Sequence, residues 1–274
     1  MTENAYKPQP ATILDIETLS PSVKLFTLKL RKPFKKNTQG LYFTPGQFVM
    51  AGEIGYGESP FGVASSPYSP LIKLCVRAVG NLTNELHRKE KGETLTVRGP
   101  YGNGFPIKKM AKKHVIMAAG GVGIPPIVPL VEYIIKNRPK FSETHLLYGA
   151  ATPQDLLFRA EYPRWQTHGI DMCLTIDKPS SGWEGEIGFV SALCKIIDVD
   201  PRETVVVTCG PGPMMDAMEK TVHPLGVSDE NIYISDERRL RCAIGKCQHC
   251  TTGRKYVCMD GPIFAYADIK DNWD

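Results

Sequence analysis

The chain has 274 residues, of which 42% are hydrophobic and 23% are charged, and its net charge at pH 7 is +4. This composition is typical of a soluble globular protein and excludes a disordered chain. The 33 basic and 29 acidic residues are interspersed, so a nucleic-acid-binding surface is not indicated. The length allows two domains, because single hydrophobic cores seldom grow beyond about 250–300 residues.

The first 20 residues lack the basic and apolar regions of a signal peptide. Glycine or proline interrupts the longest apolar runs well before the roughly 18 residues that would span a membrane. We therefore expect a cytoplasmic protein. Thiols stay reduced in that compartment, so the eight cysteines favour a metal or redox site over a set of disulfides.

Short strand-like segments dominate the first part of the chain, at 11–19, 23–30, 46–52, 71–79 and 93–100. Glycines and prolines separate them, a pattern typical of an antiparallel barrel or sandwich. One short amphipathic helix is expected at 82–90, where Thr83 would cap its start. We predict an antiparallel β-barrel domain over residues 1–109.

After residue 110, buried strand-like runs such as VIMAAG, HLLYGAA and VVVTCG alternate with helical stretches. This alternation is typical of a parallel α/β sheet. We predict a nucleotide-binding α/β domain over residues 110–230. The remaining residues, 231–274, form a small irregular segment that carries half of the cysteines.

The cysteines of this last segment have the spacing C-x4-C-x2-C-x7-C, at Cys242, Cys247, Cys250 and Cys258. Plant-type [2Fe-2S] ferredoxins use C-x4-C-x2-C with a fourth cysteine further along, so that four thiolates hold two irons. Gly245 lies inside the predicted wrap, where a small residue lets backbone N–H groups approach the sulfides. His249 is expected to be exposed or to neighbour the cluster.

Zinc is the main alternative at these cysteines, although structural zinc sites typically show two close pairs such as C-x2-C twice. A disulfide is disfavoured in a reducing compartment. Of the other four cysteines, Cys75, Cys173 and Cys194 are expected to be small buried hydrophobic residues.

Two turns predict a nucleotide site. Gly120, Gly121 and Gly123 separate a hydrophobic strand from a helix, so that the backbone and the helix N-terminus could meet a pyrophosphate. Glycines also occur in such turns for steric reasons alone. The second turn, Cys209-Gly210-Pro211, again follows a strand, and both turns would lie at the carboxyl ends of parallel strands, where ligands bind. Cys209 would face the ligand or be a buried thiol.

The strand-rich first part, the G-G-x-G-x-x-P turn, the C-G-P turn and the four-cysteine segment together resemble the ferredoxin-NADP reductase superfamily. The segments ERRLRCAIGKCQHC and KYVCMDGPIF resemble its branch with a C-terminal cluster domain. That branch contains the dihydroorotate dehydrogenase electron-transfer subunit, the gamma subunit of sulfhydrogenases and the B subunit of anaerobic sulfite reductase. The segments VRGPYGNGFPI and TPQDLLF also resemble the sulfhydrogenase subunit, and the resemblance covers nearly the whole chain.

The resemblance implies FAD in the first domain. Phe61 would offer an aromatic face to the flavin, and backbone groups of the next residues would bond its ring edge. A helix N-terminus would face the phosphates. The implied flavin contacts are Pro60, Phe61, Gly62, Val63, Gly80, Asn81, Leu82 and Thr83.

On the nicotinamide side, the resemblance places Gly120, Gly121 and Gly123 at the pyrophosphate of NAD(P)H. It places the second turn near the nicotinamide, with Cys209 as the residue beside the reacting ring and Gly210 and Pro211 as contacts.

One departure from the superfamily concerns its Arg-x-Tyr-Ser flavin motif, which corresponds here to Ser59, Phe61 and Gly62. The flavin phosphate would then be met by another cation, for which we select Arg77. Backbone donors would take the place of the serine hydroxyl, and FMN is an alternative to FAD.

The resemblance implies an electron-transfer subunit. NAD(P)H would deliver a hydride to the flavin, and electrons would leave singly through the [2Fe-2S] cluster to a partner redox enzyme of the hydrogenase or sulfite reductase type. The alternatives are a zinc-bearing flavin scaffold subunit and a self-sufficient NAD(P)H:acceptor flavin reductase.

The choice between NADH and NADPH stays open in the sequence, where Arg159 would meet a 2′-phosphate or face solvent. The basic stretch DERRLR, residues 236–241, would dock an acidic partner surface or form a solvated face.

Overall fold

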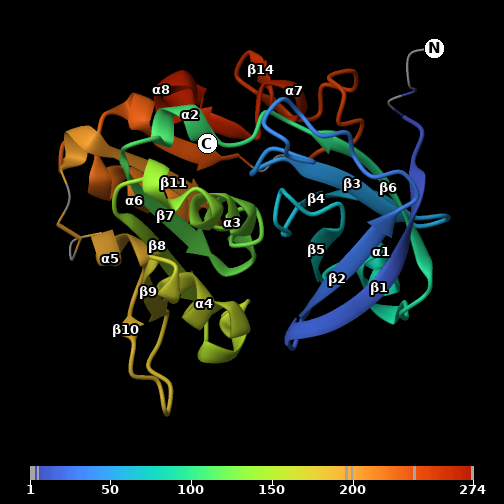
Figure 1. The fold of residues 1–274 in the computed structure, drawn as a ribbon, viewed down its shortest axis with the longest axis horizontal. Coiled ribbons are helices and arrows are strands. Elements are labelled where there is room, and N and C mark those ends of the chain that lie inside the picture. Colours follow the sequence, from blue (N-terminus) through green and yellow to red (C-terminus); the bar gives the residue numbers. More distant parts are fainter. Residues whose placement is uncertain (1–3, 5, 195–196, 199, 237–238, 273–274) are drawn as a thin grey trace.

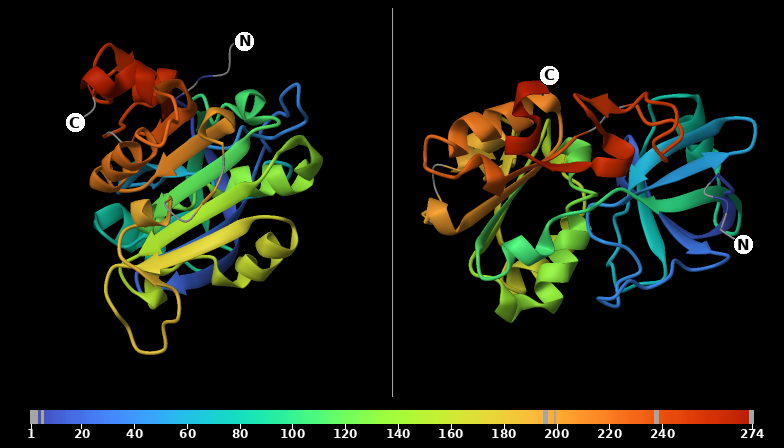
Figure 2. Two further views of the ribbon diagram at one scale, coloured as in Figure 1. Left: turned by 90° about the vertical axis from the view of Figure 1, so that its left-hand side faces the viewer. Right: turned by 90° about the horizontal axis from the view of Figure 1, so that it is seen from above.

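The computed structural model describes residues 4, 6–194, 197–198, 200–236 and 239–272. Two sheets form the centres of two adjacent parts of the molecule, with the first part in blue and cyan (Figure 1). The C-terminal segment, in red, lies across the junction between them (Figure 2).

The first part is a six-stranded antiparallel sheet with the strand order β4-β3-β6-β1-β2-β5. Its strands are β1 (Gln9–Ser20), β2 (Val23–Leu30), β3 (Phe48–Glu53), β4 (Gly57–Gly62), β5 (Ile72–Arg77) and β6 (Thr94–Tyr101). An antiparallel bridge between Val63 and Leu74 joins the β4 end of the sheet to β5. The sheet therefore closes into a barrel, and the predicted antiparallel barrel is confirmed.

One helix of the barrel domain, α1 (Asn81–Arg88), packs Leu82 and Leu86 into the barrel interior. Its start is held by Thr83, whose hydroxyl accepts the N–H groups of Val79 and Gly80, both at 3.0 Å. The helix begins one residue earlier than expected, and Thr83 caps it from within the first turn.

The second part is a seven-stranded sheet with the order β10-β9-β8-β7-β11-β12-β15. Its strands are β7 (His114–Gly120), β8 (Thr144–Ala150), β9 (Asp171–Ile176), β10 (Glu186–Ile187), β11 (Thr204–Cys209), β12 (Ile232–Ser235) and β15 (Ile263–Ala265). Neighbouring strands are parallel except β12 and β15. This confirms the predicted parallel α/β sheet.

Helices cover both faces of this sheet. Trp165 of α4 (Tyr162–Thr167) and Val131 of α3 (Val128–Lys136) share a core with Leu25 of the barrel. On the other face, α5 (Val190–Leu193) and α6 (Gly212–Val222) pack through Val190 and Met218. The barrel therefore packs on the α3 and α4 side, so the two parts share a continuous hydrophobic core.

The C-terminal segment spans both parts. It adds β15 to the second sheet and contains β13 (Thr251–Thr252), β14 (Lys255–Tyr256), α7 (Val257–Asp260) and α8 (Tyr266–Ile269). Cys250 and Val257 pack with Phe48 and Met50 of the barrel. The cysteines are thereby held against the barrel. The remaining short helix, α2 (Ile107–Met110), follows the barrel.

Among the helices of the described residues, none is long and apolar enough to span a bilayer.

Candidate electron-transfer site

The four cysteines of the C-terminal segment converge in two pairs. The Cys242 and Cys247 thiols are neighbours, and so are the Cys250 and Cys258 thiols. Cys250 and Cys258 are each 2% exposed, whereas Cys247 is exposed. One pair therefore faces the interior, and the other reaches the surface.

Backbone N–H groups surround these sulfurs. The Cys242 Sγ accepts from Ile244 at 3.5 Å and from Lys246 and Cys247 at 3.3 Å each. Burial opposes ionisation of the Cys242 thiol, but these donors outweigh it and lower its pKa to about 7. Such donors stabilise negative charge on sulfur, which is what a thiolate ligand needs.

The paired arrangement favours two irons over one zinc. A tetrahedral zinc with Zn–S bonds near 2.3 Å brings all four sulfurs to about 3.8 Å of one another. Within the described ranges, no three of these sulfurs lie together within 4.8 Å. Two adjacent thiol pairs match the ligands of a two-iron cluster, in which each iron binds two of the four thiolates.

Gly245 lies at the centre of this loop with φ +73°. Its N–H donates to Cys258 Sγ at 3.2 Å, so it joins the two ends of the cysteine segment. A Cβ at this position would lie 2.9 Å from Cγ of Met259. The positive φ favours glycine here, and a larger residue would have to displace the exposed Met259 side chain.

The two predicted nucleotide turns lie side by side. β7 and β11 are adjacent parallel strands, with Cys209 opposite Ala119. A Cβ on Gly123 would lie 2.2 Å from the carbonyl oxygen of Cys209, and one on Gly120 would lie 2.5 Å from Sδ of Met214. These two glycines let the turns touch, which is a steric role.

A cavity of about 560 Å³ opens at the carboxyl edge of the second sheet. Its lining includes Gly120, Gly121 and Pro211 of the two turns, together with Asp177 after β9 and the exposed Phe189. Gly123 and Gly210 are absent from that lining. Among the described residues, no lysine or arginine belongs to this lining, and Arg159 is exposed elsewhere in a short 3-10 turn.

Cys209, selected as the residue beside the nicotinamide, is completely buried. Its side chain belongs to the core that also contains Met117 and Val207. The structure therefore brings the backbone of the Cys209 turn to the nucleotide cavity and the thiol into the core.

The predicted flavin stretches also come together. α1 contacts β4 and β5, which places Gly80–Thr83 beside the strand that carries Phe61. Leu82 turns into the barrel interior, whereas Arg77 and Gly80 are exposed. A Cβ on Gly80 would meet nothing within 4 Å, so there is space beside this residue, whose own N–H already donates to the Thr83 hydroxyl.

Position 62 has no room for a side chain, because a Cβ on Gly62 would lie 2.6 Å from Cγ of Pro126. Pro126 precedes α3, so Gly62 lies at the contact between the barrel and the second sheet. A serine side chain at position 62 would meet Pro126 in this arrangement. A flavin edge would therefore be bound by backbone groups of this stretch, of which the Val63 N–H already donates to the carbonyl of Gln47 at 3.2 Å.

A small cavity joins the flavin stretch to the cysteine segment. It measures about 150 Å³ and is lined by residues of three parts of the molecule. Pro60 and Gly62 come from β4, Pro126 from the start of the α3 region, and Leu240 and Pro262 from the C-terminal segment. The predicted flavin and cluster sites are therefore neighbours in space.

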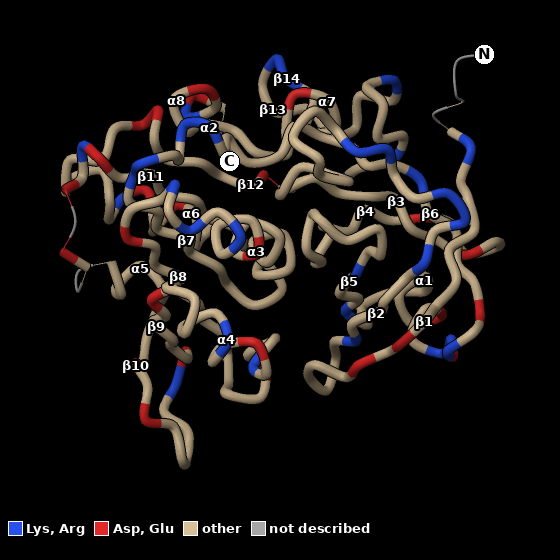
Figure 3. Tube along the Cα trace, viewed as in Figure 1, with Lys and Arg blue, Asp and Glu red and all other residues tan. Residues whose placement is uncertain are grey.

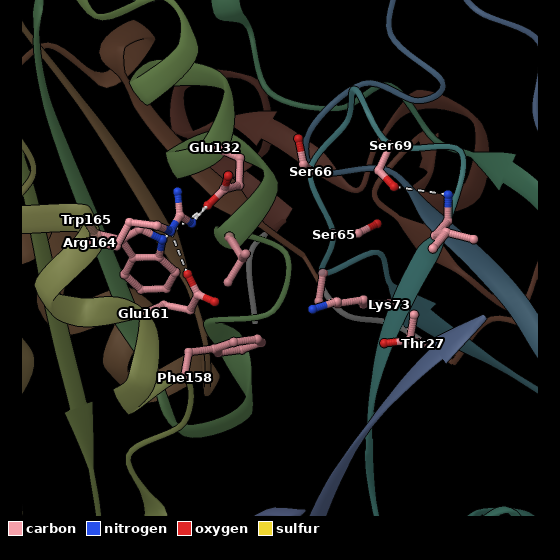
Figure 4. A pocket seen from close by; sticks show the side chains of 13 residues that line it. Thr27, Ser65, Ser66, Ser69, Lys73, Glu132, Phe158, Glu161, Arg164 and Trp165 are labelled. Atoms are coloured by element: carbon pink, nitrogen blue, oxygen red, sulfur yellow. Dashed lines mark hydrogen bonds and ion pairs between the residues drawn. The ribbon is translucent and has the colours of Figure 1, made fainter. Parts of the chain in front are cut away.

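A further cavity of about 240 Å³ lies between the barrel and the helices α3 and α4 (Figure 4). On one wall, Arg164 is bonded to both Glu132 and Glu161. On the other wall are Ser65 and Lys73. None of the predicted site residues lines this cavity, and its helical wall carries two carboxylates and one guanidinium, with Lys73 on the opposite wall.

Sequence reasoning missed one buried charge at the site, Arg98 of β6, which is 5% exposed. It bonds to Glu58 of β4 and to the backbone at Cys242. The available signal was a lone arginine beside Val97 in a strand expected to be half-buried.

Comparison with known proteins agrees with this geometry. Residues 117–220 match the model of an oxidoreductase NAD-binding domain, and residues 237–270 match that of the iron–sulfur cluster binding domain of dihydroorotate dehydrogenase B. The fold is similar to that of an NADH-dependent reduced ferredoxin-NADP oxidoreductase, with a TM-score of 0.74 over 100% of this chain and 94% of that one, at 23% identity. The protein is therefore an oxidoreductase with an NAD-binding domain and an iron–sulfur domain on a ferredoxin-reductase fold.

Two curated relatives define its family. Sulfhydrogenase 2 subunit gamma of Pyrococcus furiosus is 35% identical over 97% of both chains. A probable dihydroorotate dehydrogenase B (NAD(+)) electron transfer subunit of Thermococcus kodakarensis is 37% identical over 85% of this chain and 89% of that protein. The chain belongs to the family that these electron-transfer and gamma subunits form, and the predicted resemblance is confirmed.

Proposed function

We propose that this protein is an electron-transfer subunit that moves electrons between NADH and a partner redox enzyme through FAD and a [2Fe-2S] cluster. The observation that carries the proposal is the cavity shared by Gly62 of β4, Pro126 and Leu240. The cavity supports a flavin that would lie between the nucleotide domain and the C-terminal segment. Electron tunnelling between cofactors requires that kind of proximity.

The cluster would be held by Cys242, Cys247, Cys250 and Cys258. When bound, a flavin accepts a hydride, and a [2Fe-2S] cluster carries single electrons. The protein's part is to position both groups. The N–H groups of Ile244, Gly245, Lys246 and Cys247 point at ligand sulfurs and would stabilise the charge of the reduced cluster.

FAD would lie along β4 and the end of β5. The backbone at Gly62 and Val63 would bond the flavin edge, and Phe61 would lie beside the ring. Arg77 and the N-terminus of α1 would meet the phosphates, because Arg77 is exposed and the space beside Gly80 leaves room at the start of that helix.

The partner is proposed to present an acidic surface to the cluster. Between residues 239 and 259 the sequence has five lysines and arginines and no acidic residue, as the charges at the cysteine loops show (Figure 3). Arg239, Arg241, Lys246 and Arg254 are exposed around the surface pair of cysteines. Of the stretch 236–241, Glu237 and Arg238 lie outside the described residues. The names of the relatives favour a hydrogenase or dihydroorotate dehydrogenase partner.

Purified anaerobically, the protein is expected to contain about two irons and two acid-labile sulfides per chain. With NADH it should reduce its partner, at a rate that falls as ionic strength rises, because exposed charges steer docking. Zinc without sulfide would instead identify a scaffold subunit. Fast turnover with a small acceptor alone would identify a self-sufficient reductase.

Coenzyme choice follows from the lining of the 560 Å³ cavity. A 2′-phosphate would bring about two negative charges into a lining whose described residues include Asp177 and no cation. We expect kcat/KM for NADH to exceed that for NADPH by at least about tenfold, equivalent to about 1.4 kcal/mol. Steady-state kinetics with both nucleotides measure this ratio.

The variant Asp177→Asn should raise kcat/KM for NADPH and so bring it closer to kcat/KM for NADH. The control is Glu184→Gln, which removes an exposed acid from the loop after β9 and outside the cavity lining. Equal kcat/KM values for NADH and NADPH in the wild type would contradict the preference for NADH. Equal effects of the two variants would contradict the role of Asp177.

A further inference from the structure

Arg98 is the most completely bonded charged side chain near the cysteine segment. Its guanidinium has five N–H donors, and the structure records five bonds for them. Nε and Nη2 bind the two carboxylate oxygens of Glu58, with 2.8 Å for the Nε bond. Nη1 donates to the Tyr101 hydroxyl at 3.1 Å.

The remaining two hydrogen bonds of Arg98 are made to the C-terminal segment. Nη1 donates to the carbonyl of Cys242 at 2.8 Å, and Nη2 donates to the carbonyl of Arg241 at 3.2 Å. These carbonyls belong to the first predicted cluster ligand and the residue before it. The buried guanidinium of Arg98 therefore bonds both to the backbone of the first predicted ligand and to Glu58 of β4, the strand of the predicted flavin site.

The group stays charged in this position. Burial alone would lower the pKa of Arg98, but its bonds to Glu58 and Tyr101 raise that pKa above the ordinary arginine value. Its planar fork binds a carboxylate and two carbonyls at fixed angles, which a lysine ammonium cannot reproduce.

We propose that Arg98 is a positioning residue that locks the Cys242 end of the cluster loop to the flavin strand through Glu58. The proposal rests on the proposed function in that Cys242 is taken as a cluster ligand. It adds a mechanical and electrostatic link between the two cofactor sites, since the cation lies beside the ligand and favours the extra negative charge of a reduced cluster.

Asn103 provides the structural comparison. Its side chain also ties the C-terminal segment to the barrel, donating to the carbonyls of Asp260 and Ile263 at 2.9 and 2.7 Å. The Asn103 side chain is uncharged and bonds to the segment after its last cysteine, Cys258. A variant at Asn103 therefore loosens the segment without altering the charge next to Cys242.

The test uses the holoprotein with the variants Arg98→Met, Arg98→Lys, Glu58→Gln and Asn103→Ala. The midpoint potential of the cluster is expected to fall in Arg98→Met and to rise in Glu58→Gln, because the two changes remove opposite charges. It should stay unchanged in Asn103→Ala. Iron release to a chelator should be about tenfold faster or more in both Arg98 variants, the factor expected for a lost charge-assisted hydrogen bond.

Unchanged potentials in Arg98→Met and Glu58→Gln, or shifts of the same sign, would overturn the electrostatic link. Wild-type iron release in Arg98→Lys would overturn the positioning role. If Arg98→Met does not fold, Arg98→Lys and Glu58→Gln still decide the question.

Hydrogen exchange on the metal-free protein separates this inference from the proposed function. Amides of residues 241–247 should exchange faster in Arg98→Lys than in Asn103→Ala, whichever metal the wild type binds. Zinc in the wild type would refute the proposed cluster, whereas equal exchange in the two variants would refute the role of Arg98.

Discussion

Replacing Cys258 by serine is expected to remove the [2Fe-2S] absorption and to lower electron transfer to the partner by more than about 100-fold, because even the hydrogen-bond partners of metal ligands are worth roughly 10–100-fold. Cys258 is buried beside Cys250 and accepts the N–H of Gly245, so its sulfur closes the loop from the far end of the segment. Flavin reduction by NADH should continue, since the nucleotide cavity is lined by other residues. Iron and sulfide content and stopped-flow absorbance measure the two effects separately.

The control is Cys173→Ser in β9, a partly buried cysteine that lies outside the C-terminal segment. It should keep both iron and partner reduction at the wild-type level. An unchanged iron content in Cys258→Ser would show that this thiol is no ligand and would remove the basis of the proposed relay.

The substitution Gly123→Ala, which adds a single methyl group, is expected to cause a large loss of stability. In Gly123→Ala the new Cβ would lie 2.2 Å from the carbonyl oxygen of Cys209 and 2.7 Å from Cα of Gly210. Both contacts are with backbone, so no side chain can rotate away, and the two turns must separate. We expect the free energy of unfolding to fall by about 3 kcal/mol, at the upper end of the usual cost of overpacking.

The separated turns should also raise KM for NADH, because Gly120 and Pro211 on either side of the contact line the nucleotide cavity. Chemical denaturation and steady-state kinetics give the two measurements. Gly212→Ala is the control, since a Cβ there meets nothing within 4 Å at the start of α6. It should change stability by no more than about 0.5 kcal/mol. Similar losses in the two variants would contradict the steric argument.

Local patterning predicted most of the architecture. In β2 polar and apolar residues alternate, and β11 is largely apolar over its full length. Both patterns predict a strand because they reflect which side chains are buried in the folded sheet. β4 escaped prediction. Its sequence, GESPFG, has two glycines and a proline, which are depleted in strands, and only pairing with β3 makes it a strand.

The glycines show a second limit of sequence reasoning. The glycine turn predicts a pyrophosphate contact, and the contacts that exclude side chains at Gly120 and Gly123 are with Met214 and Cys209. A glycine in a turn signals that something approaches closely. Whether that is a ligand or a neighbouring turn depends on which strands are adjacent in the sheet.

By itself, the sequence determined the two sheet types and the cluster motif, because strand periodicity and cysteine spacing are local properties of a chain. Only the tertiary structure decided how the thiols pair, that the Cys209 side chain enters the core, and that Arg98 reaches the carbonyl of Cys242. Arg98 and Cys242 are separated by 144 residues, and no local pattern records such a contact. It exists because the C-terminal segment packs on the barrel, where burial of an arginine requires that all its donors find partners.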